Sequence, residues 1–316
     1  MSKSFDLRRA RPWEVALTVF SLSAPLLVPF VAHGDGGFIR RAVAQEMQQV
    51  DTSKLVTIGG AVTEIVYALG EGGRIVARDS TSMYPEEAMK LPDVGYMRAL
   101  SPEGVIAVNP TAILAVEGSG PADALAVLKS AGIPFETVPE GYDRAAILRK
   151  IDVVGNFLGV PEKAKALEDK VGAELDAAIA DAAKRPADQR KRVLFVLSFQ
   201  NGRIMAAGNH TAADGIIGLA GAVNATDSTF EGYKPLTDEA VINAKPDVVM
   251  VMTRPGAGST DEEVLAHPAI AVTPAGQNKA ILRMNSLHLL GFGPRTASAI
   301  SDLNKELYGK PGNVSQ

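Results

Sequence analysis

The residue types best suited to hold a small molecule gather in two nearby segments in the N-terminal third of the chain. The segment Ser82–Glu87 contains Tyr84, and the segment Pro92–Arg98 contains Tyr96 and Arg98. A tyrosine ring can stack on a flat ligand while its hydroxyl group makes a polar contact, and an arginine supplies a cation for an anionic group. This combination favours a binding site.

The sequence lacks the motifs of the common enzyme classes. It has no Gly-x-Ser-x-Gly elbow, P-loop, His-Glu-x-x-His or dinucleotide-binding glycine motif in a supporting context. It also has no cysteine, which excludes thiolate nucleophiles, Cys-type zinc sites and disulfides. A net charge of −4 argues against a nucleic-acid partner, which would require clustered lysine and arginine. We therefore expect a binding protein that is not an enzyme.

A faint internal duplication indicates which elements position these residues. Leu100–Pro110 and Leu236–Pro246 share leucine, glutamate, valine, isoleucine and proline at a constant offset of 136 residues. Each copy predicts a short helix that begins after an N-capping hydroxyl residue, Ser101 or Thr237, and ends at the proline. The apolar run after each copy is typical of a buried parallel strand. Any two βα units look alike, but the shared order of landmarks favours two related lobes.

The two copies differ in the connection that precedes the duplicated helix. From Asp79 to Leu100 the first lobe has a longer loop than the second lobe has from Asp227 to Leu236, and Tyr84 lies in it. Loops at the carboxyl ends of parallel strands are where ligands usually bind α/β sheets. We therefore expect the ligand site at this loop, in a cleft between the lobes.

A long helical stretch separates the two lobes. Ala145–Leu158 and Glu162–Ala183 have apolar residues at helical spacing, and Gly159–Pro161 marks a break. We predict an α/β fold of two related lobes, each with a central β-sheet flanked by helices, joined by a long connecting helix. The predicted boundaries are 45–147 for the N-terminal lobe, 148–185 for the connecting helix and 186–316 for the C-terminal lobe.

Residues 1–44 are predicted to be a signal peptide. Arginines precede an apolar run from Val15 to Ala32, and Ala42–Ala44 fits the small-x-small pattern of a signal-peptidase site. The alternative is a membrane anchor, because the run is close to the minimum spanning length. Pro25 and Pro29 within the run favour export. We expect a protein that acts in the periplasm after cleavage.

Several motifs resemble the periplasmic haemin-binding proteins of bacterial haem-uptake ABC transporters, which are class III solute-binding proteins with a helical backbone. The run around Tyr84 is the feature that separates haem binders from siderophore and vitamin B12 binders in this class. The resemblance implies the class III periplasmic binding protein fold and a role in delivering ferric haemin to an inner-membrane ABC importer. The segments that carry it are Thr57–Gly70, Asp79–Glu86, Gly95–Gly104 and Leu290–Arg295.

The resemblance further implies that Tyr84 ligates the haem iron. A phenolate is a hard anionic donor that suits ferric iron, and tyrosine is an established haem ligand. A free tyrosine has a pKa of about 10, so ligation requires the iron or a nearby cation to favour the ionised form. Arg98, Arg254 and Arg295 are candidates for that cation or for pairs with the haem propionates. The alternative for Tyr84 is a half-buried loop tyrosine that bonds to the backbone.

Four further residues are candidates for the haem pocket. Tyr96 and Tyr233 each follow a glycine shortly before the duplicated helix, which is consistent with positions on opposite walls of the cleft. The alternative for both is half-buried packing. His210 and His288 are candidates for a second axial ligand, because imidazole binds haem iron well. Some members of the family hold two haems through an added histidine, which would fall near Phe230 here. We therefore expect one haem that is five-coordinate through Tyr84.

Glu103 and Glu239 occupy equivalent positions in the duplicated helices. The resemblance implies that a glutamate on each lobe docks with arginines on the two permease subunits, and separated carboxylates would orient such docking. The alternative is that each glutamate only stabilises the N-terminus of its own helix.

The expected partners are haem and the dimeric ABC permease of the inner membrane, with an outer-membrane haem receptor system as a further candidate. A binder of ferric siderophore or corrinoid is the first alternative, in the same fold. A metal-dependent hydrolase or chelatase acting in the cleft is the second, from a different class.

Overall fold

The computed structural model describes residues 50–200, 202–253 and 259–309, and residues 49–316 form one compact unit. The predicted signal peptide, residues 1–44, lies outside the described residues. Within the described part of the chain, no helix combines the length and the apolar character that a membrane crossing requires.

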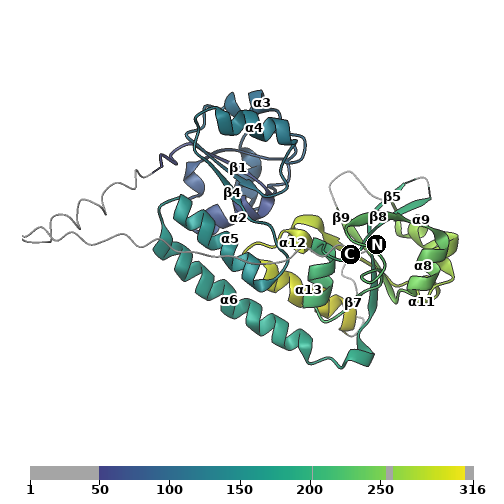
Figure 1. Cartoon of the computed structure of the whole chain (residues 1–316). Coiled ribbons are helices and arrows are strands. Elements are labelled where there is room, and N and C mark those ends of the chain that lie inside the picture. Colours follow the sequence, from purple (N-terminus) through teal and green to yellow (C-terminus); the bar gives the residue numbers. More distant parts are fainter. Residues whose placement is uncertain (1–49, 201, 254–258, 310–316) are drawn as a thin grey trace, which may run out of the picture. The chain divides into compact units, whose positions relative to one another are not determined.

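The N-terminal sheet is entirely parallel and has the strand order β2-β1-β3-β4 (Figure 1). Its strands β1 and β3 are fully buried, as expected for a parallel sheet that is covered on both faces. The strands are β1 (Leu55–Ile58), β2 (Ile75–Arg78), β3 (Ala112–Val116) and β4 (Phe135–Val138). The helices of this part are α2 (Gly60–Ala68), α3 (Pro102–Ile106) and α4 (Ala122–Ser130), with the 3₁₀ helices η1 (Gly72–Arg74) and η2 (Glu86–Lys90).

The C-terminal sheet has the order β10-β9-β5-β6-β8, and β7 also pairs with β5. It is mixed: β10, β9, β5 and β7 are parallel neighbours, whereas β6 is antiparallel to both β5 and β8. The strands are β5 (Arg192–Gln200), β6 (Arg203–Ala207), β7 (Val223–Asn224), β8 (Tyr233–Leu236), β9 (Val248–Thr253) and β10 (Ile281–Asn285). The helices are η3 (Ala187–Gln189), α7 (Ala212–Leu219), α8 (Asp238–Ala244), α9 (Asp261–Leu265), α10 (Pro268–Ala271), α11 (Pro274–Gln277), α12 (Ser286–Leu290) and α13 (Thr296–Tyr308).

The two predicted duplicated helices are present as α3 and α8, and each is followed by a parallel strand, β3 or β9. The predicted ends at Pro110 and Pro246 are wrong, since α3 ends at Ile106 and α8 at Ala244. The residues directly before the two prolines, Asn109 and Lys245, have positive φ values of 51° and 45°, which do not continue a helix. Ser101 Oγ accepts a hydrogen bond from Gly104 N at 3.2 Å, and Thr237 Oγ1 accepts one from Ala240 N at 3.2 Å. Both hydroxyl residues are therefore N-caps with the same geometry. The copies diverge in the sheets, since β6 and β8 add an antiparallel portion only to the C-terminal one.

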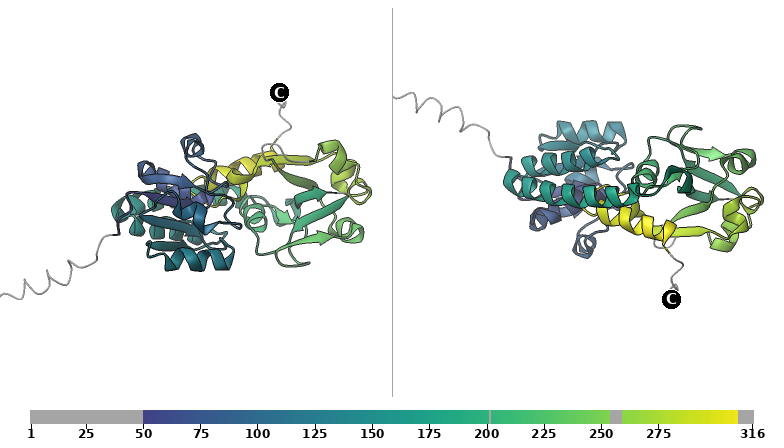
Figure 2. Two further views of the ribbon diagram at one scale, coloured as in Figure 1. Left: turned by 90° about the horizontal axis from the view of Figure 1, so that it is seen from above. Right: turned by 90° about the horizontal axis from the view of Figure 1, so that it is seen from below.

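The helical stretch between the sheets contains α5 (Arg144–Phe157) and α6 (Pro161–Ala183), with the predicted break between them. Proline opens α6 at its first turn, where the missing backbone N–H costs nothing. Helix α6 packs against both α5 and α13, and Figure 2 shows α6 and α13 side by side. The predicted lobe boundaries remain a prediction.

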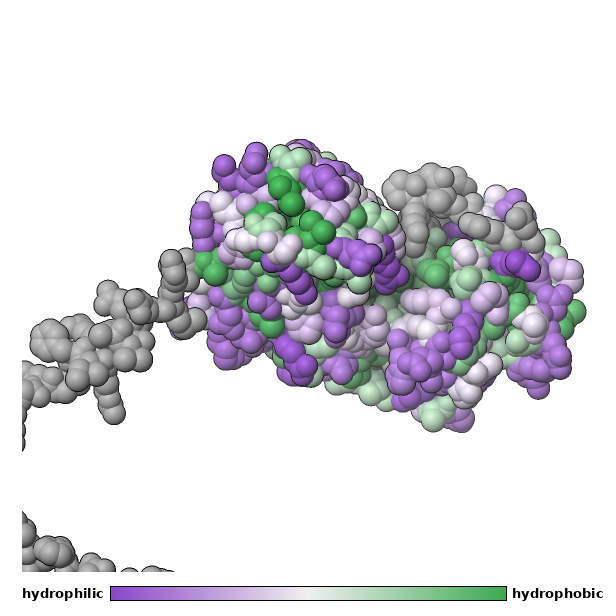
Figure 3. Space-filling model, turned by 45° about the horizontal axis from the view of Figure 1, so that its top comes forward, coloured by the Kyte–Doolittle hydropathy of each residue, from purple (hydrophilic) through white to green (hydrophobic). Residues whose placement is uncertain are grey.

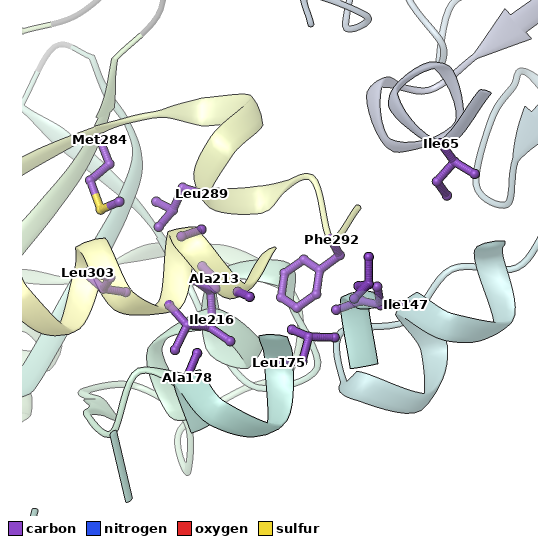
Figure 4. Packing of buried hydrophobic residues seen from close by; sticks show 14 of the residues in the cluster. Ile65, Ile147, Leu175, Ala178, Ala213, Ile216, Met284, Leu289, Phe292 and Leu303 are labelled. Atoms are coloured by element: carbon purple, nitrogen blue, oxygen red, sulfur yellow. The ribbon is translucent and has the colours of Figure 1, made fainter. Parts of the chain in front are cut away.

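One apolar cluster joins these helices to both sheets. Figure 4 shows Ile147 of α5 and Leu175 of α6 beside Phe292, which is 1% exposed, and Ile216 of α7 next to Ala213 and Ala178 in the same cluster. Leu303 of α13 extends the cluster toward the C-terminal sheet. Because this core is continuous across residues from both lobes, the helical connection is rigidly packed on both of them.

Candidate functional site

The loop that carries Tyr84 begins with a fully buried aspartate, Asp79, directly after β2. One carboxylate oxygen of Asp79 accepts hydrogen bonds from Gly59 N (2.9 Å) and Ser82 Oγ (2.6 Å). The other accepts from Thr81 N (3.0 Å) and Thr81 Oγ1 (2.6 Å). Hydrogen bonds to an ionised group are the stronger kind, so they fix the start of the loop.

A chain of buried hydroxyl groups anchors the same loop to helix α2. Ser82 Oγ lies 2.6 Å from Thr63 Oγ1, which in turn lies 2.7 Å from Thr57 Oγ1 on β1. All three residues are 0% exposed. Polar networks in the interior rigidify a site when every member is bonded, so the chain that leads to Tyr84 is preorganised.

In contrast with this buried start, the side chain of Tyr84 is 41% exposed and is covered on one ring face by Arg295. The guanidinium carbon of Arg295 lies 3.5 Å from the centroid of the tyrosine ring, which is a cation–π contact. Arg295 directly precedes α13, so the structure brings together two residues that the sequence separates widely. The contact places a positive charge at the phenol ring.

Glu64 of α2 holds Arg295 in this position. Arg295 donates from Nη2 to Glu64 Oε2 at 2.8 Å and from its backbone N–H to Glu64 Oε1 at 3.1 Å. The Glu64 side chain is only 7% exposed, against 29% for Arg295. The carboxylate therefore holds the arginine by an ion pair on the buried side and leaves one face of the guanidinium group to Tyr84.

His288 extends this charged cluster on its outer side. Its Nδ1 lies 3.5 Å from Arg295 Nη1, and its Nε2 lies 3.0 Å from Asp302 Oδ2. Both ring nitrogens are thus engaged within the protein. His288 contacts the arginine that covers Tyr84, and does not present a free nitrogen to the cleft.

A pocket of about 480 Å³ lies beside this cluster and is lined from both lobes. The N-terminal lobe contributes the residues around the Tyr84 loop, including Tyr96, which is 46% exposed. Most of the surface from the C-terminal lobe is apolar. The lining residues are Ser80, Thr81, Met83, Tyr96, Met252, Ser286, Leu287 and Leu290.

Two of the lining residues, Thr81 and Leu287, closely approach Gly60 at the start of α2. A Cβ atom on Gly60 would lie 2.4 Å from Leu287 Cδ1 and 2.9 Å from the Thr81 carbonyl oxygen. Only glycine fits at this position without displacement. The requirement explains the glycine at the start of α2 and fixes how closely Leu287 sits to the Tyr84 loop.

Arg98 is exposed and has no ion pair among the described residues. Burial, followed by the charge of Glu140, raises the pKa of Tyr142 to about 12, and the charge of Arg98 opposes that rise. Burial also raises the pKa of Tyr233, again against the charge of Arg98. Arg98 is therefore within electrostatic reach of both tyrosines.

Tyr233 is half-buried on β8, with its ring centroid 6.5 Å from that of Phe195 in the core. It is not among the residues that line the pocket. Tyr142 takes an interlobe position instead, with its ring centroid 5.2 Å from that of Phe292.

Of the remaining candidates from the sequence, His210 is not among the residues that line the pocket. His210 is highly exposed, and its Nδ1 lies 3.3 Å from Glu231 Oε1. Arg254 lies outside the described residues. Within the residues that the structure describes, no cluster of three or more His, Asp or Glu side chains is arranged to hold a metal ion directly.

Glu103 and Glu239 are both exposed on the first turn of their helices. Bonds from the Glu103 backbone N–H and from the Ser101 hydroxyl group hold the pKa of Glu103 below its usual value. Ser101 Oγ donates to Glu103 Oε2 at 2.8 Å. Glu239 lines a separate, open pocket of about 410 Å³ together with Ser228 and Thr237.

Sequence reasoning did not identify Glu64 or the apolar wall formed by Met252 and Leu287. Glu64 had a usable signal, because it is the one charged residue in the apolar helix Gly60–Ala68. A lone carboxylate on a buried helix face requires a cationic partner. The apolar wall had no such signal, since its members resemble ordinary core residues.

Comparisons with known proteins agree with this architecture. Residues 55–286 match the family model described as periplasmic binding protein. The ABC transporter substrate-binding lipoprotein YvrC of Bacillus subtilis is 30% identical over 82% of this chain and 81% of its own length. The vitamin B12-binding protein of Yersinia pestis is 28% identical over 63% of this chain and 69% of its own. Among solved structures, the periplasmic heme-binding protein BhuT in complex with two hemes is 39% identical, with a TM-score of 0.76, covering 80% of this chain and 97% of that one.

Proposed function

Because the chain belongs to the periplasmic binding protein family, a family of exported solute-binding proteins and not of enzymes, we propose that its cleft captures ferric haemin in the periplasm for an ABC importer. The observation that carries this proposal is the exposed Tyr84 ring with Arg295 stacked 3.5 Å above it. The haem-binding relative BhuT, 39% identical, supports the choice of ligand.

Tyr84 is the proposed iron ligand. A phenolate bonded to ferric iron carries negative charge, and Arg295 places a cation against its ring. The hydrogen-bonded start of the loop holds Tyr84 in place, so little ordering is required when the ligand binds. Arg98 is the proposed partner of a haem propionate, since it is exposed and has no ion pair in the described chain.

The pocket beside Tyr84 suits a flat apolar macrocycle. Met252, Leu287 and Leu290 form an apolar wall opposite Tyr96, whose ring can stack on a porphyrin face. A hydroxamate or catecholate siderophore would find few polar partners on that wall. The vitamin B12-binding relatives make a corrinoid the alternative that an experiment must separate from haemin.

The test is the absorption spectrum of the purified protein titrated with haemin. The proposal predicts a saturable Soret band and a high-spin ferric charge-transfer band, both of which change in Tyr84→Phe. Tyr96→Phe is the matched control, because it removes a hydroxyl group from the same pocket and should keep the charge-transfer band. Tight binding of cyanocobalamin with no saturable haemin spectrum would establish the corrinoid alternative.

We further propose that Glu103 and Glu239 dock the loaded protein on the two subunits of the ABC permease. Both carboxylates are exposed, and they stand at equivalent positions on helices that are capped in the same way. Such charges steer and orient association with an oppositely charged partner. The double variant Glu103→Arg/Glu239→Arg should abolish haemin transport into vesicles that contain the permease while leaving haemin affinity unchanged. Transport at the wild-type rate would refute the docking role.

A further inference from the structure

An exposed isoleucine accompanies each of the two docking glutamates. Ile106 on α3 is 36% exposed, and Ile242 on α8 is 43% exposed. The two occupy equivalent positions in the duplicated segments, each three residues after its glutamate. Residues three apart lie on the same face of a helix, so each helix presents a carboxylate and an aliphatic side chain together.

The residues just before these isoleucines show that both helices sit on their lobes in the same orientation. Val105 and Val241 are both 0% exposed and belong to the two smaller apolar clusters, one in each lobe. The valine of each helix therefore supplies the contact with the core. Neither isoleucine belongs to any of the three apolar clusters of the described chain or to the partly buried residues that pack against them.

Further exposed aliphatic side chains lie on the helices that neighbour α3 and α8. Val127 on α4 is 48% exposed, and α4 packs against α3. Val272, at the end of α10, is 56% exposed, and α10 packs against α8. Figure 3 shows apolar surface exposed on the lobe that carries α3 and α4. A single exposed aliphatic residue is ordinary, but the equivalent isoleucines on α3 and α8, each with a further exposed aliphatic residue on a neighbouring helix, indicate a contact surface.

We propose that Ile106 and Ile242 are the apolar half of two equivalent docking points, each of which inserts an aliphatic side chain into one subunit of the permease. The inference rests on the proposed docking role of Glu103 and Glu239. Two equivalent docking points match a partner that is itself two-fold symmetric. At each point, a carboxylate beside an isoleucine is complementary to a basic residue beside an apolar pocket. The glutamates orient the encounter, and the isoleucines slow dissociation.

The expected size of the effect follows from the burial of one aliphatic side chain at each point. Replacing either isoleucine by serine should weaken binding to the permease about tenfold, since a tenfold change corresponds to about 1.4 kcal/mol, the scale of one partly buried aliphatic group. The double variant should lose about a hundredfold, because the two points contact separate subunits and their effects add.

The experiment measures binding of the full mature protein to its permease in lipid nanodiscs by surface plasmon resonance. The variants are Ile106→Ser, Ile242→Ser and the pair, with Ile106→Leu and Ile242→Leu as conservative replacements that keep the aliphatic contact. Met89→Ser is the matched control, because Met89 is also exposed (50%) but lies on η2. Haemin titration and thermal melting are run on every variant.

The inference predicts faster dissociation for the serine variants, near wild-type binding for the leucine variants and for Met89→Ser, and unchanged melting. Wild-type dissociation of the double serine variant would overturn it, as would failure of the wild-type protein to bind the permease. If the wild-type protein and the variants bind the permease as predicted but none of them binds haemin, the haem proposal fails and the docking inference stands.

Discussion

Replacing Arg295 by methionine tests the central charged contact, because methionine keeps much of the side-chain length and removes the guanidinium group. The change leaves Glu64, whose side chain is 7% exposed, with only the backbone N–H of residue 295 as a partner from that side. It also removes the cation from the ring of Tyr84. We expect both the free energy of unfolding and haemin affinity to fall.

The loss of stability follows from the burial of the pair. Removing one partner of a fully buried ion pair costs about 3–5 kcal/mol. Since the Arg295 side chain is 29% exposed, we expect a loss at or below the lower end, about 2–3 kcal/mol. For a chain of this size, each kcal/mol shifts the melting temperature by about 2–4 °C, so Arg295→Met should melt about 4–12 °C lower.

A second substitution separates stability from ligand binding. In Glu64→Gln/Arg295→Met the buried charge is gone, so most of the lost melting temperature should return, while haemin affinity should stay low because the cation at Tyr84 is still missing. Glu174→Gln, which changes an exposed glutamate on α6, is the control and should melt within about 1 °C of wild type. Differential scanning calorimetry measures the melting temperature of each variant, and haemin titration measures its haemin affinity. The reasoning is refuted if Arg295→Met melts like wild type, or if the double variant recovers haemin affinity together with stability.

Two further predictions concern stability away from the ligand contact. Burial raises the pKa of Tyr142 to about 12 from its ordinary value of 10. The neutral tyrosine therefore contributes fully to the free energy of unfolding below pH 10, and this contribution is lost as the pH rises toward 12. Urea unfolding should give a lower free energy of unfolding at pH 11.5 than at pH 9, and this difference should be smaller in Tyr142→Phe than in wild type. An equal difference in both proteins would contradict the role given to Tyr142. Thr237→Ala should cost about 1 kcal/mol in urea unfolding because it removes the N-cap of α8, whereas Thr237→Ser should retain most of that stability. Equal stability of the alanine variant and wild type would contradict the capping role.

The duplicated helices and the strands after them are predictable from sequence because their signals are local. Ser101 and Thr237 each stand three residues before the amide that they cap, and the following apolar runs are long enough to identify buried strands. The break between α5 and α6 is local too, since Gly159–Pro161 cannot continue a helix.

The Tyr84 contact shows where this local reasoning ends. Glu64 and Arg295 are separated by 231 residues, and only the packing of α2 against the segment before α13 brings them together. The sequence presented Arg295 as one of three candidate cations, with nothing to choose among them. Only the geometry of the folded chain identifies Arg295 as the arginine that contacts Tyr84, because a contact between residues far apart in the chain leaves no pattern in the sequence.

The position of His288 illustrates the same limit. From the sequence it is a candidate axial ligand, since imidazole binds haem iron. In the fold its two ring nitrogens lie next to Arg295 and Asp302. The side chain therefore supports the arginine on Tyr84, which is a role that only its neighbours reveal.

The crystal structure of the haemin complex tests the account most directly. It should show the Tyr84 hydroxyl oxygen bonded to the iron, with the Arg295 guanidinium still stacked on the tyrosine ring and the macrocycle against Leu287 and Leu290. Iron held by any other side chain, or a haemin bound outside the pocket between the lobes, would contradict it.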